Sequence, residues 1–144
     1  MKVLFAFGPS LGALGTREPE KYGTETLGQI MEKVAERAVP LGHEVEYRQS
    51  DLEGDIVGWV LGAAAEGFAA VVMNPGALSH YSLALRDAVG SSSTPVVEVH
   101  QTNIYSREEF RRHSVISPVA KIVIAGAGTG GYHLALEALP WITT

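Results

Sequence analysis

The sequence contains no cysteine. This absence excludes disulfide bonds, thiolate metal ligands and a cysteine nucleophile. Basic residues are also few, with 11 Lys and Arg against 16 Asp and Glu, and the formal net charge is −5. This balance does not favour nucleic acid or an anionic membrane as a partner.

Long hydrophobic runs are missing as well. The N-terminal stretch "MKVLFAFGPS" has a short apolar run that ends at Gly8 and Pro9, too short for a signal peptide or a membrane span. We therefore expect a cytoplasmic protein without a membrane partner.

The composition that is present is that of a globular protein. The chain has 144 residues, of which 46% are apolar and 19% are charged. This length and this apolar content predict one domain, residues 1–144, with a real hydrophobic core.

Short apolar runs alternate with helical patterns along the whole chain. The predicted strands are Lys2–Phe7, Glu44–Gln49, Ala69–Met73, Val96–Val99 and Lys121–Ala125. The predicted helices are Thr26–Val39, Gly54–Ala65, Ser79–Val89, Arg107–Arg112 and Gly130–Leu139. Capping boxes are expected at Thr26 with Gln29 and at Ser106 with Glu109.

This alternation predicts an α/β fold with a doubly wound, five-stranded parallel sheet. The flavodoxin-like strand order 2-1-3-4-5 is the expected one. Ligands of such sheets bind beyond the carboxyl ends of the strands. The segments that follow the first, third and fourth strands are rich in polar residues, so a site is expected where they meet.

The segment after the first strand is unusually long. A compact α/β domain usually joins a strand to a helix in about 2–6 residues, whereas here the loop covers residues 8–23 and includes Arg17 and Tyr22. A long glycine-rich loop suits a lid that closes over a substrate. A guanidinium near a tyrosine favours the phenolate, which makes Tyr22 a candidate base.

The stretch "GAGTGG", residues 126–131, matches a dinucleotide-binding glycine pattern. Only thirteen residues follow it, and no acidic residue lies about 20 positions further on to hold a ribose. We interpret it as a tight turn, and no cofactor is expected.

Two histidines, His80 and His100, fall just beyond predicted strands on the expected site edge, whereas His43 and His133 do not. Their neighbours at that edge are Asn74, Glu98, Arg107 and Arg111. No histidine pair has the spacing of a helical zinc site, so no metal is expected. An isolated histidine is more often structural than catalytic, but two on one edge with these neighbours make acid–base catalysis an equal alternative.

Several motifs together resemble one family, the type II 3-dehydroquinate dehydratases. They are "GP-x-L-x-x-LGTREPE-x-YG", "YRQSDLEG", "NPGALSH", "EVHQTN", "REEFRRHSVISPVA" and "GYHLALEAL". The resemblance runs nearly end to end. It implies a flavodoxin-like fold, a homo-dodecamer built as a tetramer of trimers, and the cofactor-free dehydration of 3-dehydroquinate to 3-dehydroshikimate in shikimate or quinate metabolism.

The resemblance also implies catalytic roles. Tyr22 matches the base that removes a proton from C2, and Arg17 matches the arginine that activates it. His100 matches the acid that protonates the departing C1 hydroxyl, with Glu98 orienting it. Ser10 stands where the family has a catalytic asparagine, which holds a water that stabilises the enolate.

Further matches concern substrate binding. Asn74, His80 and Arg111 match residues that hold ring hydroxyls, and the backbone of Gln101 and Thr102 matches a cradle for the carboxylate. Arg107 matches a second arginine near the base. Asp87 matches an acidic residue that reaches into a neighbouring subunit's site.

Four positions depart from the family pattern: Phe7, Ser10, Leu78 and Gln101. We expect them in or next to the pocket, where they bear on activity or substrate. Three hypotheses stay open: a 3-dehydroquinate dehydratase, a divergent paralogue acting on a related hydroxylated ring ketone, and a non-catalytic binding protein with a ligand at "GAGTGG". The sequence does not distinguish a biosynthetic from a catabolic role.

Overall fold

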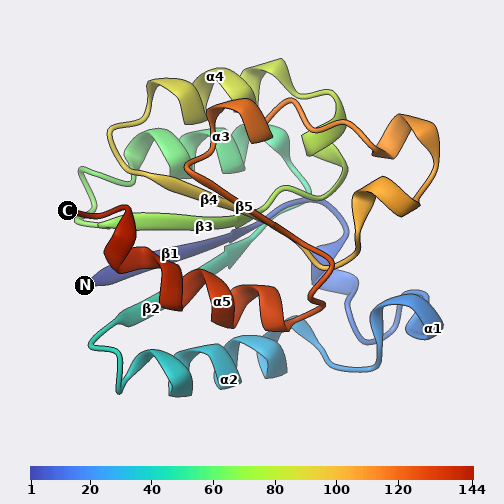
Figure 1. Ribbon diagram of the computed structural model, residues 1–144, viewed down its shortest axis with the longest axis horizontal. Helices are drawn as coiled ribbons and strands as arrows, with labels where there is room; N and C mark the ends of the chain where they lie inside the picture. The colour runs from blue at the N-terminus through green and yellow to red at the C-terminus, as the bar shows by residue number, and fades with distance from the viewer.

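A parallel sheet lies at the centre of the protein (Figure 1). The computed structural model describes residues 1–20 and 23–144. Within these residues the sheet has five strands in the order β2-β1-β3-β4-β5, as the sequence predicts. The strands are β1 (Lys2–Phe7), β2 (Glu44–Gln49), β3 (Ala70–Asn74), β4 (Val96–His100) and β5 (Ile122–Ala125).

Helices cover both faces of the sheet. They are α1 (Pro19–Tyr22), α2 (Leu27–Ala38), α3 (Glu53–Gly62), α4 (Leu83–Ser91) and α5 (Gly130–Ala138). Figure 1 shows α3 and α4 on one face, α2 and α5 on the other, and α1 beyond the carboxyl ends of the strands. Each face buries its own apolar cluster, which explains why the residues of β3 and β4 are buried throughout.

One of the two capping boxes expected from the sequence is present, and the other is not. Thr26 and Gln29 form the expected capping box at the start of α2. The predicted helix Arg107–Arg112 is wrong, because this stretch contains only the 3₁₀ turn Glu109–Arg111. Asn103, rather than Ser106, accepts a backbone N–H in front of the preceding 3₁₀ turn, and Arg107 is extended, so no α-helix forms there.

The segment between β1 and α2 is not an open loop in its described part. It contains the 3₁₀ turn Leu11–Ala13 and the start of α1, and it lies at the carboxyl end of the sheet (Figure 1).

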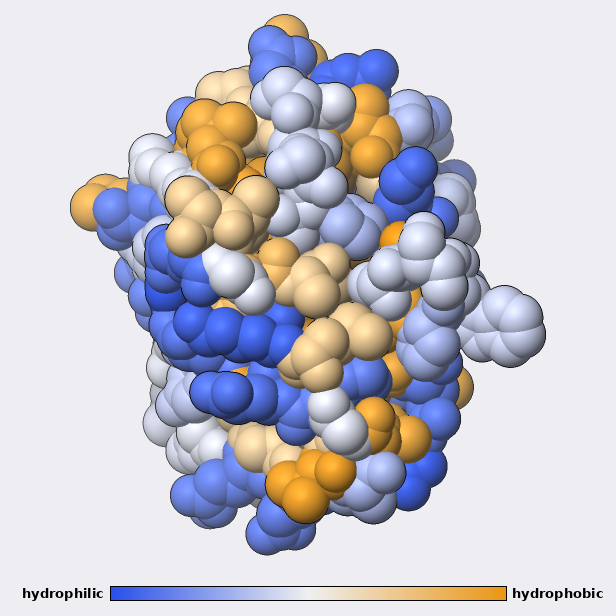
Figure 2. All heavy atoms as spheres, turned by 90° about the vertical axis from the view of Figure 1, so that its left-hand side faces the viewer, coloured by the Kyte–Doolittle hydropathy of each residue, from blue (hydrophilic) through white to orange (hydrophobic). Residues whose placement is uncertain are grey.

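Figure 2 shows the opposite end of the molecule, where hydrophilic and hydrophobic residues are interspersed. Within the described residues, no helix combines the length and apolar character needed to cross a membrane.

Candidate active site

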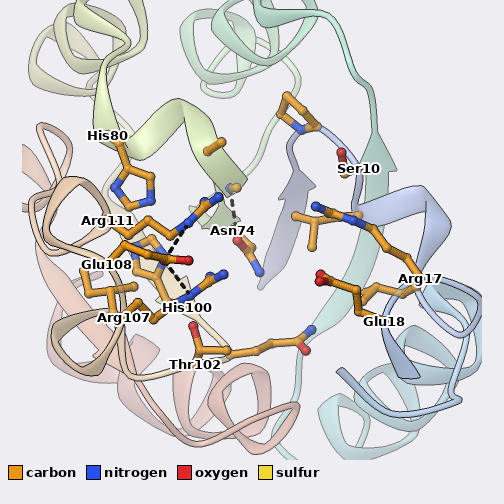
Figure 3. Close-up of a pocket in the computed structure, with 17 residues that line it drawn as sticks. Ser10, Arg17, Glu18, Asn74, His80, His100, Thr102, Arg107, Glu108 and Arg111 are labelled. Atoms are coloured by element: carbon orange, nitrogen blue, oxygen red, sulfur yellow. Dashed lines mark hydrogen bonds and ion pairs between the residues drawn. The ribbon is translucent and has the colours of Figure 1, made fainter. Parts of the chain in front are cut away.

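A cavity of about 290 Å³ opens at the carboxyl end of the sheet. Its walls come from the segment after β1, from the ends of β3 and β4, and from the segment that follows β4. Figure 3 shows Ser10, Arg17 and Glu18 on one side, His80, His100, Arg107 and Arg111 on the other, and Asn74 between them. The meeting of these segments at one edge is what the strand order predicted.

The described lining carries three guanidinium groups and two carboxylates, although the chain as a whole is acidic. Arg107 and Arg111 both lie near Glu108, with the Nε atom of Arg111 3.1 Å from a carboxylate oxygen and that of Arg107 3.9 Å away. Arg17 faces them across the cavity (Figure 3). This arrangement suits a small anionic ligand.

The end of β4 presents an acid–base pair. His100 lines the cavity, and its Nε2 atom lies 3.4 Å from Oε1 of Glu98. Glu98 is fully buried behind it. Burial raises the pKa of Glu98, but the nearby His100 ring and the hydrogen bonds from Ser114 and Ser117 outweigh burial and leave that pKa below its ordinary value. The carboxylate is therefore ionised near neutral pH and lies against the His100 ring.

His80 has a defined hydrogen-bonding state. Its Nδ1 atom lies 2.8 Å from the carbonyl oxygen of His113. A carbonyl oxygen only accepts, so Nδ1 carries a hydrogen and the bond leaves Nε2 for a ligand in the cavity. Such a residue can hold a hydroxyl group.

The amide of Asn74 is oriented by two contacts. Its Oδ1 atom accepts the backbone N–H of Gly76 at 3.1 Å, and its Nδ2 donates to the hydroxyl of Tyr132 at 2.9 Å. Gln101 donates to the same hydroxyl at 3.0 Å. Burial raises the pKa of Tyr132, and the bonds from the two amides only partly offset this. Tyr132 is thus a neutral support for two cavity residues and not a base.

Ser10 has an unusual backbone. Its φ is 70°, in the left-handed region, and its N–H donates to a carboxylate oxygen of Asp51 at 2.9 Å. Asparagine adopts this region more readily than serine does. The conformation therefore suits the asparagine that the resemblance expects here, and serine occupies it with some strain.

Among the described residues, no group of three His, Asp or Glu side chains lies close enough to hold an ion. The glycine-rich stretch after β5 forms a turn, with Gly126 and Gly128 at positive φ, and none of its residues lines the cavity.

Nearly the whole chain is similar in sequence to known proteins of one family. The family model for class II dehydroquinase matches residues 1–140. The chain belongs to this family. Its relatives include the 3-dehydroquinate dehydratases of Pelotomaculum thermopropionicum, 54% identical over 96% of this chain and 95% of that one, and of Kineococcus radiotolerans, 51% identical over 96% and 94%.

Solved structures of the family share the fold. The type II dehydroquinase of Butyrivibrio crossotus matches with a TM-score of 0.94 and 41% identity, covering 97% of both chains. The doubly wound sheet with this strand order is therefore the fold of the class II dehydroquinases.

Most of the site residues predicted from the sequence meet at the cavity. They are Ser10, Arg17, Asn74, His80, His100, Gln101, Thr102, Arg107 and Arg111. Glu98 lies directly behind His100. Asp87 is exposed on α4 and does not line this cavity. Tyr22 lies outside the described residues.

Two of the four departures lie in the core and not in the cavity lining. Phe7 is fully buried in the core and packs edge-on against Tyr132, with ring centroids 5.4 Å apart. Leu78 is buried in the cluster on the other face of the sheet. Neither lines the cavity, because both side chains turn toward helices that cover the sheet. Among the four departures, only Ser10 and Gln101 reach the site.

Sequence reasoning missed the supporting residues. Tyr132, Ser114 and Ser117 bind site side chains from α5 and from the segment after β4. No periodicity or spacing marks them, since their contacts depend on how distant segments pack.

Replacing Tyr132 with phenylalanine tests this support. The change removes the acceptor for two amide groups and leaves Asn74 held only by the backbone N–H of Gly76. We therefore expect KM to rise about tenfold, the equivalent of roughly 1–2 kcal/mol for a lost buried hydrogen bond. Steady-state kinetics and thermal unfolding measure the effect. The matched control is Tyr47→Phe, whose ring also packs on Phe7 but does not line the cavity. Equal kinetics for the two variants would contradict the supporting role.

Proposed function

We propose that this protein dehydrates 3-dehydroquinate to 3-dehydroshikimate without a cofactor. The proposal is carried by His100, which faces a cavity lined by three guanidinium groups and has Glu98 buried behind it, in a chain of the class II dehydroquinase family. Loss of water β to a ketone needs a base, an acid and stabilisation of an enolate.

The proposed mechanism has two steps. Tyr22, with its phenolate favoured by Arg17, takes the C2 proton, and the electron pair moves onto the C3 ketone oxygen to form an enolate. The enolate then re-forms the ketone as the C1–C2 double bond forms and the C1 hydroxyl leaves. His100 gives that hydroxyl a proton, so the leaving group is water. Proton transfer from Tyr22 back to His100 through solvent restores the enzyme.

The remaining cavity residues are proposed to hold the substrate. Asn74, His80 and Arg111 suit the ring hydroxyls, and the backbone at Gln101 and Thr102 suits the carboxylate. Arg107 is proposed to lie near the base.

Assembly and location are part of the same proposal. We infer a cytoplasmic homo-dodecamer, a tetramer of trimers, in which Asp87 reaches the site of a neighbouring subunit. The exposure of Asp87 on α4 supports this role. Light scattering tests the assembly, and a monomer in solution would contradict it.

The direct test follows product formation. Purified protein mixed with 3-dehydroquinate is expected to produce the ultraviolet absorbance of the conjugated product. The absence of turnover at high enzyme concentration would overturn the assignment.

A second candidate is a paralogue that acts on a related hydroxylated ring ketone. Ser10 and Gln101 favour it, because both line the cavity and both depart from the family pattern. Turnover of such a ketone in preference to 3-dehydroquinate would support this candidate.

Ser10→Asn is the informative variant. We expect it to raise kcat between about tenfold and a hundredfold, because an amide offers more hydrogen bonds than a hydroxyl to a water beside the enolate. Ser10→Gly is the matched control, since it relieves the left-handed backbone without adding a donor. An equal gain in both variants would assign the effect to backbone strain instead.

A further inference from the structure

Two serines surround the buried carboxylate of Glu98. The Ser114 hydroxyl lies 2.5 Å and 3.1 Å from its two oxygens, and the Ser117 hydroxyl lies 3.1 Å and 2.7 Å from the same atoms. Glu98 itself has no exposed surface. A carboxylate in such a place is costly unless donors satisfy its oxygens, and each hydroxyl has only one proton to give.

The two serines are held by their own turn. The Ser114 oxygen accepts the backbone N–H groups of Ile116 and Ser117, both at 3.2 Å. Its proton is therefore free to point at Glu98, and the turn presents the second hydroxyl to the same carboxylate. The segment is fixed to the fold because the N–H of Val115 donates to the carbonyl of Ser79 at 2.7 Å.

We infer that Ser114 and Ser117 are positioning residues that fix the Glu98 carboxylate against His100. Neither serine lines the cavity, so neither touches the substrate. Their donated hydrogen bonds offset the burial of the carboxylate and hold it ionised in one rotamer. The orientation of the His100 imidazole then depends on a turn that begins 14 residues later in the chain, at Ser114.

The other charged groups near Glu98 and His100 bind partners other than the Glu98 carboxylate. His100 supplies the charge that acts on Glu98. On α4, Arg86 donates to the carbonyl of Val115 at 2.8 Å. His80 contacts the carbonyl of His113, and Arg111 pairs with Glu108. The neutral hydroxyl groups of the two serines therefore donate the hydrogen bonds that the Glu98 carboxylate accepts.

The direct test measures Glu98 by carbon NMR of labelled glutamate carboxyl groups, with Glu98→Gln assigning the signal. We expect Ser117→Ala to raise the pKa of Glu98 by about one unit, because one donor to the charged form is lost. Ser92→Ala is the matched control: Ser92 is also half-buried and hydrogen-bonded, but it binds the carbonyls of Val60 and Thr94. An unchanged Glu98 titration in Ser117→Ala would overturn the inference.

The kinetic test rests on the proposed function, whereas the NMR test does not. Failure of the inference can therefore be distinguished from failure of the proposed function. We expect Ser117→Ala to lower kcat about tenfold with KM unchanged, and to move the acidic limb of the kcat profile to higher pH. Ser117→Thr, which keeps the hydroxyl, is expected to restore both. In a Glu98→Gln background, Ser117→Ala should have no further effect on kcat. A full additional loss there, or an unshifted pH profile in the single variant, would show a merely structural role.

Discussion

Replacing His100 with glutamine is expected to lower kcat by about 10³-fold, the scale of a lost general acid. Glutamine keeps much of the size and a hydrogen-bond donor, but it does not deliver a proton to the departing hydroxyl. KM should change little, because His100 is proposed to act on the leaving group. Stopped-flow or steady-state absorbance of the product measures the loss.

His133→Gln is the matched control for this experiment. His133 lies on α5 and does not line the cavity, so its replacement should leave kcat unchanged. A His100→Gln variant with activity close to that of the unaltered protein would show that another group supplies the proton.

Replacing Arg17 with alanine is the second large effect, an expected loss in kcat/KM of about 10²- to 10³-fold at neutral pH. Arg17 lines the cavity opposite Arg107 and Arg111 (Figure 3). If it favours the phenolate of Tyr22, its loss raises the apparent pKa on which kcat/KM rises. The activities of the two proteins should therefore converge as the pH increases.

Two comparisons sharpen the Arg17 experiment. Arg37→Ala is the matched control, because Arg37 pairs with Glu137 away from the cavity. In a Tyr22→Phe background, Arg17→Ala should cost little more, since no phenol remains to be activated. A loss of equal size at every pH would mean that Arg17 binds the substrate and does not activate the base.

The sequence by itself determined the fold and the edge at which the site forms. Buried apolar runs of β-strand length separated by amphipathic stretches dictate a doubly wound sheet, and a parallel sheet brings the carboxyl ends of its strands together. Ser10, Asn74 and His100 follow or end three of these strands, so their order in the chain is enough to predict that they share one site. The local signals failed for the stretch 107–112, where Asn103 and an extended Arg107 direct the chain into short 3₁₀ turns.

Only the tertiary structure decided what stands behind the site. Phe7 and Leu78 are in the core because the strand pleat and the turn after β3 direct them under helices. Tyr132 supports Asn74 across 58 residues of sequence, and Ser117 reaches Glu98 across 19. Spacing along a chain carries no information about such contacts, because they are set by the packing of α5 and of the turn after β4 against the sheet.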